Sequence, residues 1–420
     1  MVVQHNLQAM NANRMLNITT GSQSKSAEKL SSGYRINRAA DDAAGLSISE
    51  KMRKQIRGLD QASTNAEDGV SAVQTAEGAL TEVHSMLQRM NELAVQASNG
   101  TNSQTDRDAI QSEIDQLTTE IDRVAETTKF NESYLLKGDA DGNTKNVYMK
   151  GHDAGLKGTL TDGATTATFK VAAGALDAGK SATIGGKEYT IGATVADGKK
   201  LLGAKYDGSV KAKVNGVEYT LVANGDENEK ANKLGKTEME AKIVAGATVE
   251  VGGKSLTIMD DNGNGVDKSN SSVITAEKAI SLMNAELLSA NNIGAADTAA
   301  TMGQAPTYTS ADGAEFTINK GFATVADKLN FNLHVGSDAD MTNKINVNIE
   351  TMNSSYLGIK GINVADDTGV AATHAVDAIA DALQKVSDQR SSLGAVQNRL
   401  EHTIANLDNV VENTTSAESR

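Results

Sequence analysis

The chain has no cysteine, no tryptophan and a single proline, Pro306, in 420 residues. Without cysteine it can form neither a disulfide framework nor a thiolate metal site, and it can cross any redox compartment unchanged. Aromatic residues make up only 3% of the sequence, so large aromatic anchors do not hold its core together. The core must be built from Leu, Ile, Val, Met and Ala.

Basic clusters and long apolar runs are also missing. The formal net charge is −14, and Lys and Arg are spread along the chain, which argues against a nucleic-acid surface. Residues 1–21 lack the basic region and continuous apolar region of a cleaved signal peptide. No stretch of 18 apolar residues occurs. We therefore expect no nucleic-acid partner and no membrane span.

Motifs for catalysis or metal binding are absent as well. The six histidines include no H-E-x-x-H and no other pair at ligand spacing. The residues from Asp260 begin like a calcium loop, but the twelfth position is Ser271 and not Glu, which favours a hairpin turn. No phosphate-binding loop and no group of Ser, His and acid can be assembled. We expect no enzyme activity, no cofactor and no metal site.

Glycine divides the chain into three parts. Residues 1–137 hold 7 Gly, residues 138–365 hold 29, and residues 366–420 hold 2, so the ends favour helix and the middle favours turns. The predicted class is α+β, with a long antiparallel helical rod formed by the two ends and an inserted domain rich in β-hairpins. The predicted domains are residues 1–43, 44–137, 138–365 and 366–420.

Two helices are predicted in the N-terminal part. The first runs from about Gly45 to Asn99 with a narrow, Ala-rich apolar stripe at steps of three and four residues. At 1.5 Å per residue it would be roughly 80 Å long. After a loop at Asn99-Gly100, Thr105 and Asp108 form a T-x-x-D start signal for the second helix. Its apolar stripe is Ile110, Ile114, Leu117, Ile121 and Val124.

A third helix is predicted near the C-terminus, where apolar residues from Val376 to Val411 alternate at three and four residues through more than five heptads. A stripe this thin cannot be buried by its own helix, and each Leu or Ile left in water forgoes roughly 1.5 to 3 kcal/mol. We expect it to pack against the two N-terminal helices. A shorter amphipathic stretch, with Leu7, Met10, Leu16 and Leu30, has no obvious partner in the remaining sequence.

The middle of the chain contains a repeat, found at residues 183–191, 213–221, 249–258 and, more loosely, 310–318. Each copy has a two-residue turn such as Asn-Gly or Gly-Gly, followed by an alternating strand, which predicts a tight hairpin. Residues 275–289 and 324–334 are predicted as short helices or helix-to-strand transitions.

Charged residues line the outer face of the N-terminal helices. Arg89 and Glu92 flank Leu93 on the first helix, and Glu113 lies on the second. By default such residues form a solvated face with weak ion pairs worth a few tenths of a kcal/mol. Leu93 is unusual there, since an apolar side chain beside Arg89 could anchor a binding hot spot.

Both ends of the chain resemble bacterial flagellins. The resemblance rests on residues 30–80, which begin "LSSGYRINRAADDAAGLSISEKM", on "ELAVQASNGTNS" (92–103), on "IDRVAETTKFN" (121–131) and on "LGAVQNRLEHTIANLDNVVENTTSAESR" (393–420). These stretches cover most of residues 1–137 and 366–420. The central hairpins are similar to the repeat in the variable, outward-facing part of the family.

The resemblance implies a structural subunit of the extracellular flagellar filament. Such a subunit has other flagellin subunits as partners and is exported unfolded by the flagellar type III apparatus with a chaperone, without a cleaved signal. A chain with no Cys and one Pro has no crosslink and few slow isomerisation steps to obstruct threading. The unpartnered residues 5–33 would form part of the inner tube, ordered by neighbouring subunits. Leu7, Met10, Leu16 and Leu30 are the implied polymerisation residues.

The family is also recognised by the host's Toll-like receptor 5 through the outer helical face. The matching positions here are Gln88, Arg89, Leu93, Gln96 and Glu113. Met90 and Asn91 depart from the residues common in that motif.

Flagellins continue past "SAESR" into a further C-terminal helix, so the resemblance predicts that a chain without it makes the rod but polymerises poorly. Two alternatives stay open. A hook-filament junction protein shares the helical ends, and an adhesin or glycan-binding module could occupy residues 138–365.

Overall fold

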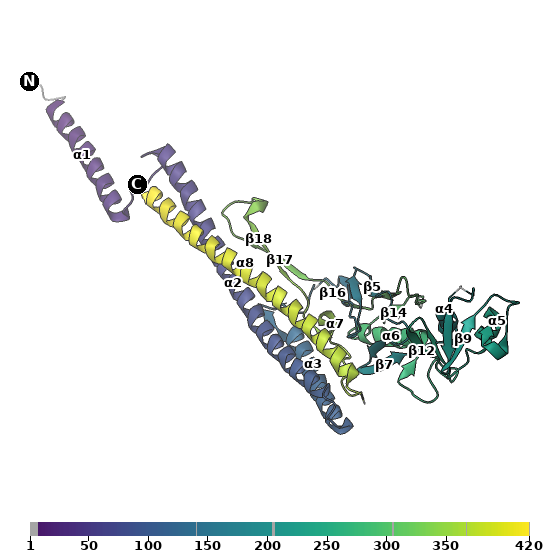
Figure 1. Cartoon of the computed structure of the whole chain (residues 1–420). Coiled ribbons are helices and arrows are strands. Elements are labelled where there is room, and N and C mark those ends of the chain that lie inside the picture. The colour runs from purple at the N-terminus through teal and green to yellow at the C-terminus, as the bar shows by residue number, and fades with distance from the viewer. Residues whose placement is uncertain (1–6, 140, 204–205, 305, 367, 420) are drawn as a thin grey trace, which may run out of the picture. The chain divides into compact units, whose positions relative to one another are not determined.

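The computed structural model describes residues 7–139, 141–203, 206–304, 306–366 and 368–419. By their contacts these residues form two compact units. Unit 1 contains residues up to Gln74, Asn330–Val347 and residues from Leu393 onward, and unit 2 contains Thr75–Leu329 and Asn348–Ser392. Each unit therefore combines segments that lie far apart in the sequence. Figure 1 shows these segments in different colours, purple and blue for the N-terminal helices and yellow for the C-terminal helix.

Four long helices come from the two ends of the chain: α1 (Leu7–Ser32), α2 (Ala43–Ala97), α3 (Gln104–Thr127) and α8 (Val370–Ser419). The expected first helix is confirmed, with both ends two residues earlier than predicted. The apolar period continues without interruption, and no proline breaks it. α8 also confirms the C-terminal prediction, and every seventh residue on it is buried. These residues are Ile379, Val386, Leu393, Leu400 and Leu407.

In unit 1, the N-terminal part of α2 packs against the C-terminal part of α8. Leu59 and Leu407 belong to one buried cluster, and Ala66 and Leu400 belong to the next. Residue numbers rise along α2 as they fall along α8, so the two segments are antiparallel. Leu333 also packs into the second cluster. A Cβ at Gly69 would lie 2.2 Å from its Cδ1 atom, so a larger residue there would require the Leu333 side chain to move.

Leu333 belongs to a two-stranded sheet formed by β17 (Leu329–His334) and β18 (Lys344–Ile349). Residues 324–334 were predicted as a short helix or a helix-to-strand transition. The predicted helix is wrong, because this segment contains only strands and a short connection. The segment continues from β16 (Phe322–Ala326) directly into β17. Alternation at Leu329, Phe331 and Leu333 fits a strand better than a helix.

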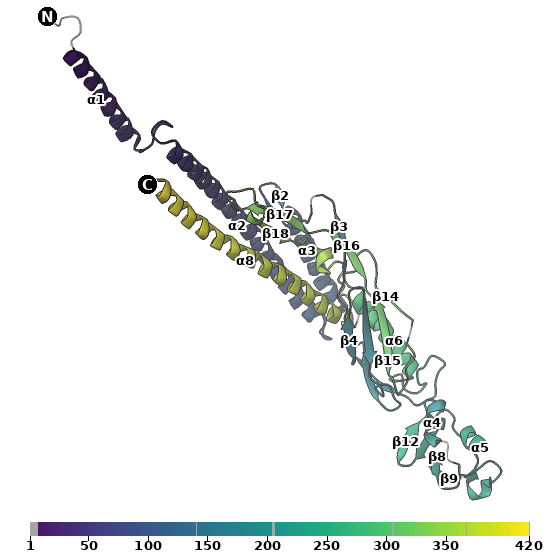
Figure 2. The same ribbon diagram turned by 90° about the horizontal axis from the view of Figure 1, so that it is seen from above.

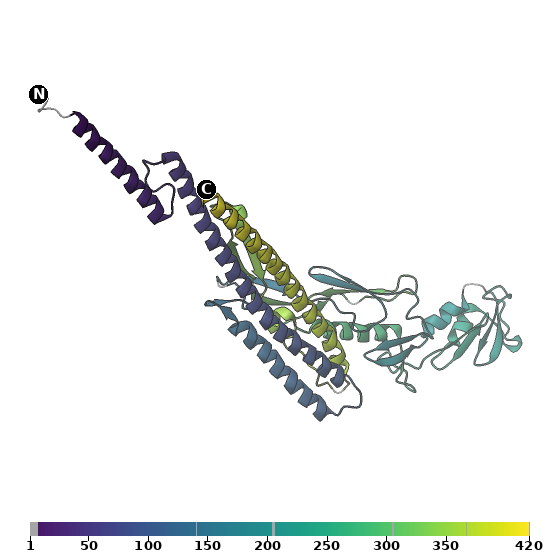
Figure 3. The same cartoon turned by 90° about the vertical axis from the view of Figure 1, so that its left-hand side faces the viewer.

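In unit 2, α3 lies beside the C-terminal part of α2 (Figure 3). Its start differs from the prediction, because Ser103 is the N-cap and forms the capping box with Asp106, whereas Thr105 and Asp108 lie inside the helix. Ser103 precedes the first helical residue and can accept from the N3 amide, which Thr105 cannot. Arg107 is buried and donates to the carbonyls of Ala97, at 3.0 Å, and Asn99, at 3.4 Å, so it fixes the α2–α3 loop.

The central part of unit 2 contains two groups of strands with a buried core each (Figure 2). The first core joins α6 (Ala276–Asn291) to the sheet β14-β15-β5-β4 (Thr301–Met302, Ala314–Asn319, Thr166–Val171, Thr159–Asp162) and the sheet β13-β7-β6 (Val273–Ile274, Lys187–Ile191, Ser181–Ile184). The second core joins α4 (Val195–Leu202) and α5 (Lys236–Ala241) to the sheet β10-β9-β8-β11-β12 (Lys233–Leu234, Val217–Leu221, Lys211–Val214, Thr248–Val251, Lys254–Thr257).

The remaining elements are short. They are β1 (Lys129–Phe130) paired with β2 (Ser133–Tyr134), β3 (Thr144–Tyr148) paired with β16, helix α7 (Ser354–Leu357), and 3-10 turns at Glu229–Ala231 and Met341–Asn343. The chain thus combines helices with several small sheets, in agreement with the predicted α+β class.

Three of the four predicted hairpins are confirmed. Strands β6–β7, β8–β9 and β11–β12 each close over the expected two-residue turn. Asn215 and Gly216 both have positive φ, 50° and 81°, as a type I′ turn requires. The fourth prediction is confirmed only in part: Thr309 and Gly313 form an antiparallel bridge across a tight turn, but strand β15 (residues 314–319) pairs with β5 and β14. Its principal partner is about 145 residues earlier in the chain, where a local turn signal gives no information.

The calcium-like segment folds as a loop around Asp267. Its carboxylate accepts from the hydroxyl of Ser269 and from the amides of Asp260, Ser269 and Asn270. These hydrogen bonds, chiefly that of the Ser269 hydroxyl, lower the pKa of Asp267 to about 2. The ionised carboxylate is therefore the form that stabilises this loop.

The lowered pKa of Asp267 predicts a pH effect. Its stabilisation should be fully present above the unfolded pKa of about 4 and should be lost as the pH falls through about 2. Asp267→Asn should remove that contribution, so the free energy of unfolding should fall less between pH 5 and pH 2 in the variant than in the parent. Denaturant titrations across this range measure the difference, and equal slopes would count against the assignment.

Candidate functional site

No metal site or membrane span is found among the described residues. No group of three or more His, Asp or Glu there could hold a metal ion. None of the described helices is both long and apolar enough to cross a membrane. Two candidate functional surfaces are helix α1 and the outer face of the α2–α3 pair.

Helix α1 has no buried residue. The predicted polymerisation residues are all exposed, with relative accessibilities of 74% for Leu7, 64% for Met10, 64% for Leu16 and 88% for Leu30. Met15 and Ile18 are also exposed, at 62% and 59%, and were not identified from the sequence pattern. Gly21 does not interrupt the helix. The large apolar side chains of α1 are therefore left exposed by the part of the chain that the structure describes.

On the α2–α3 pair, Arg89 links the two helices. Its Nε donates to Oε1 of Glu113 on α3 at 2.9 Å, and its Nη1 donates to Oε2 of Glu92, one turn along α2, at 3.1 Å. The pKa of Arg89 is raised by these carboxylates, Glu113 first and Glu92 second. The side chains of Arg89 and Glu113 are about half exposed, so the pair lies at the surface.

Gln88 and Gln96 are also exposed. The Nε2 atom of Gln88 lies 3.1 Å from Nε2 of His84, and the backbone carbonyl of Gln96 accepts from Asn102 in the loop to α3. Four of the five predicted receptor-binding residues therefore lie on solvent-accessible surface.

Leu93 differs from its predicted position, because it is only 2% exposed. The interpretation of Leu93 as an apolar anchor on the outer face is wrong for this structure. In helical projection Leu93 lies at the edge of the stripe formed by Met90, Ala94 and Ala97, which are all buried. A helix that contacts neighbours on two sides buries a wider stripe than a two-helix pattern suggests, and Leu93 falls within it.

The sequence-based prediction missed a polar cluster in unit 2. It brings Lys150 and His152, after β3, to Asp381 and Lys385 on α8. These residues come from segments more than 200 positions apart, and no local motif marks them.

Comparisons with known proteins agree with the helical ends. Residues 3–141 match the family model "Bacterial flagellin N-terminal helical region", and residues 376–420 match "Bacterial flagellin C-terminal helical region". A flagellin of Clostridium tyrobutyricum is 37% identical over 424 residues, covering 100% of this chain and 91% of that protein. Flagellin B of Vibrio anguillarum is 32% identical, covering 100% and 88%.

Solved structures of flagellar proteins are also similar, but weakly. FliC from Burkholderia pseudomallei has 21% identity and a TM-score of 0.30, covering 79% of this chain and 99% of that one. A TM-score this low carries no argument about function. The full-length flagellin match is decisive instead. The chain belongs to the bacterial flagellins, structural proteins of the flagellar filament and not enzymes.

Proposed function

We propose that this flagellin enters the filament through helix α1, while α2, α3 and α8 form an antiparallel helical rod that presents the central domain outward. The observation that supports this most is the absence of any buried residue on α1. A 26-residue helix with several exposed large apolar side chains is unfavourable in water by itself. Neighbouring subunits would supply the missing cover, so association replaces intramolecular burial.

Contacts within each unit support the rod. In unit 1, Glu418 near the end of α8 accepts from Ser49 Oγ at 2.8 Å and Arg53 Nε at 2.9 Å on α2. In unit 2, Arg390 of α8 lies 3.6 Å from Glu77 of α2. The pair in unit 1 follows the antiparallel order of the apolar clusters of that unit. The pair in unit 2 supports contact between α8 and α2 there.

The proposed route to the filament is export of the unfolded chain through the flagellar type III apparatus, assisted by a chaperone. The test uses an epitope-tagged copy of the chain, produced in a flagellated bacterium that also makes its own flagellin. Because the resemblance predicts that this chain polymerises poorly by itself, the bacterium's own flagellin supplies the filament, and we expect the tag in sheared, purified filaments built from both chains. A tag that is secreted but stays entirely in the monomeric fraction would overturn the assembly proposal.

We further propose that Toll-like receptor 5 recognises the α2–α3 surface formed by Gln88, Arg89, Gln96 and Glu113, with Leu93 beneath it. Arg89 is the central candidate, because its guanidinium is oriented by carboxylates from both helices and remains half exposed. Arg side chains held this way are frequent hot spots in protein interfaces. Leu93 would pack beneath these residues and hold them in place, and would not itself contact the receptor.

Arg89→Ala should weaken receptor binding by about tenfold or more, equivalent to about 1.4 kcal/mol. The fold should be little affected, because half-exposed ion pairs contribute at most about 1 kcal/mol. Surface plasmon resonance with the receptor ectodomain measures the affinity. Arg123→Ala is the matched control, since Arg123 pairs with Glu120 on α3 and is similarly exposed. Equal affinities for the two variants would remove Arg89 from the proposed surface.

A further inference from the structure

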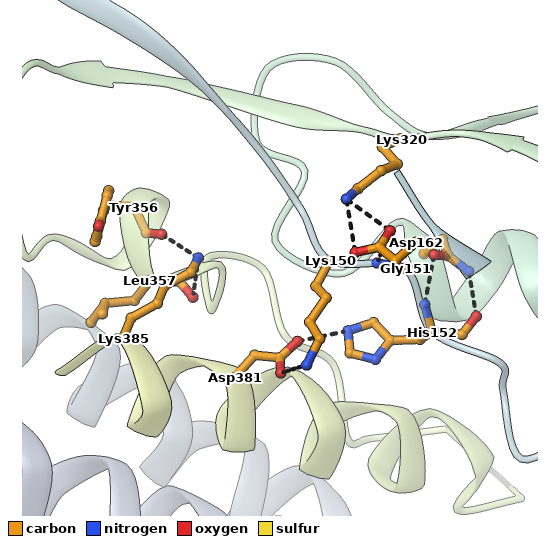
Figure 4. A network of polar contacts seen from close by, with 10 residues as sticks. Lys150, Gly151, His152, Asp162, Lys320, Tyr356, Leu357, Asp381 and Lys385 are labelled. Carbon is orange, nitrogen blue, oxygen red and sulfur yellow. Dashed lines mark hydrogen bonds and ion pairs between the residues drawn. The ribbon is translucent and has the colours of Figure 1, made fainter. Parts of the chain in front are cut away.

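A small cavity in unit 2 surrounds the end of a lysine side chain. Its volume is about 150 Å³, and the residues that line it include Lys150 and His152 after β3, Gly358 after α7, and Asp381, Gln384 and Lys385 on α8. Figure 4 shows Lys385 beside Tyr356 and Leu357, and Asp381 facing Lys150 and His152. At about 30 Å³ per water molecule, the cavity has room for only a few small molecules.

Lys385 differs from the other lysines of this region in its partners. Its Nζ donates to the backbone carbonyls of Tyr356, at 2.7 Å, and Leu357, at 3.3 Å. By contrast, Lys320 Nζ lies 2.9 and 3.2 Å from the two carboxylate oxygens of Asp162. Lys150 Nζ lies 2.9 Å from Asp381. Among the described residues, no carboxylate lies within ion-pair distance of Lys385.

The partners of Lys385 Nζ are two neutral carbonyls and the face of the Tyr356 ring, whose centroid is 5.3 Å away, so no formal negative charge among these partners holds an ammonium ion here. A neutral amine has two N–H donors and a lone pair. Burial lowers the pKa of Lys385 to about 8, with Asp381 opposing the shift and Lys320 adding to it. Compared with an ordinary lysine of pKa about 10.4, this raises the neutral fraction near pH 7.5 on the order of a hundredfold. A desolvated neutral lysine is a nucleophile.

The lining of the cavity favours an electrophile whose product is an anion. The residues around it include Lys150, His152 and Gln384. Lys320 adds a further positive charge nearby. Asp381 is the one acid among the lining residues, and it is already engaged by Lys150 at 2.9 Å and approached by His152 at 3.4 Å.

We propose that Lys385 is a reversible carbamylation site for carbon dioxide. The lone pair of its neutral Nζ forms a bond to the carbon of CO₂, and one C=O π pair moves onto oxygen. Nζ then loses a proton to solvent, which leaves a carbamate, –NH–COO⁻. No oxidant, reductant or further reactant is required. The reaction replaces a neutral or positive group by a negative one in a region that also contains Lys150, His152 and Lys320.

The experiment treats the folded full chain with ¹³C-labelled bicarbonate in equilibrium with CO₂, and traps carbamates with triethyloxonium before peptide mass spectrometry. We expect the trapped label on the peptide that contains Lys385, at least about tenfold above that on the peptide with exposed Lys360. Trapping at Lys360 equal to or above that at Lys385 would overturn the proposal. This comparison needs no variant, so it stands even if substitutions impair folding.

Carbon-13 NMR of the same samples provides a second readout. The parent and Lys360→Arg should both show a carbamate resonance that Lys385→Arg lacks, while any signal from the terminal amine persists in all three. Arginine keeps the positive charge and the carbonyl partners but is not nucleophilic at this pH. A resonance that remains unchanged in Lys385→Arg would assign the carbamate elsewhere and contradict the proposal.

Discussion

Serine at the four predicted polymerisation positions of α1 should exclude the chain from filaments without destabilising the free monomer. The variant combines Leu7→Ser, Met10→Ser, Leu16→Ser and Leu30→Ser. None of these side chains is buried within the chain, so their removal takes away no intramolecular packing. If neighbouring subunits bury them, each is worth roughly 1.5 to 3 kcal/mol in the assembly. The summed loss should reduce incorporation far more than tenfold.

The measurement is the ratio of tagged chain in sheared filaments to tagged chain in the medium. The control carries serine at four exposed polar positions of the same helix, which places the same number of serines on α1 without removing apolar side chains. These positions are Gln8, Asn11, Asn17 and Gln23. We expect the control to incorporate like the parent, and both variants to keep the parent's unfolding midpoint. Normal incorporation of the first variant would refute the role of α1.

The second large effect concerns Leu93. Leu93→Asp should destabilise unit 2 by at least about 3 kcal/mol, because it removes a buried side chain and places a carboxylate out of water. Val95→Asp, two residues along the same helix, should change stability by less than about 0.5 kcal/mol, since Val95 is 53% exposed. Denaturant unfolding followed by circular dichroism compares the two.

This pair also decides how Leu93 can be used in receptor experiments. If Leu93→Asp unfolds the helices, its loss of receptor binding reports on the fold and not on a contact. If it leaves the stability unchanged, Leu93 lies outside the core and the burial described here is incorrect. Arg89→Ala remains the direct test of the surface in either case.

The helices could be predicted from the sequence because their signals are local and long. In the 50-residue helix α8, apolar residues recur every seven positions from Ile379 to Leu407, and this spacing identifies a helix clearly. Each of the three confirmed hairpins carries its own two-residue turn. The predicted start of α3 was two residues too late, because two capping patterns overlap at this point of the sequence. Only the structure shows that Ser103 makes the capping hydrogen bond. The charged residues Arg89, Glu92 and Glu113 were also predicted, but the ion pair from Arg89 on α2 to Glu113 on α3 required the structure.

Predictions failed where a partner is distant in the sequence. β15 has the alternation of a strand, but its pairing with β5 depends on a segment about 145 residues earlier. The sequence shows that Leu93 is apolar but not which way it faces. Only the packing of α2 shows that its side chain is buried. The cluster around Lys385 joins three segments through side chains that carry no motif, so it required the structure.

Cross-linking of engineered cysteine pairs tests the antiparallel packing of α2 and α8 most directly, because the natural chain contains no cysteine. One pair is Ser49→Cys with Glu418→Cys in unit 1, and the other is Glu77→Cys with Arg390→Cys in unit 2; both replace contacting, accessible side chains. A short bis-maleimide should link both pairs within the dilute monomer and should not link the exchanged pair Ser49→Cys with Arg390→Cys. Efficient linking of the exchanged pair, or none in either matched pair, would contradict the account.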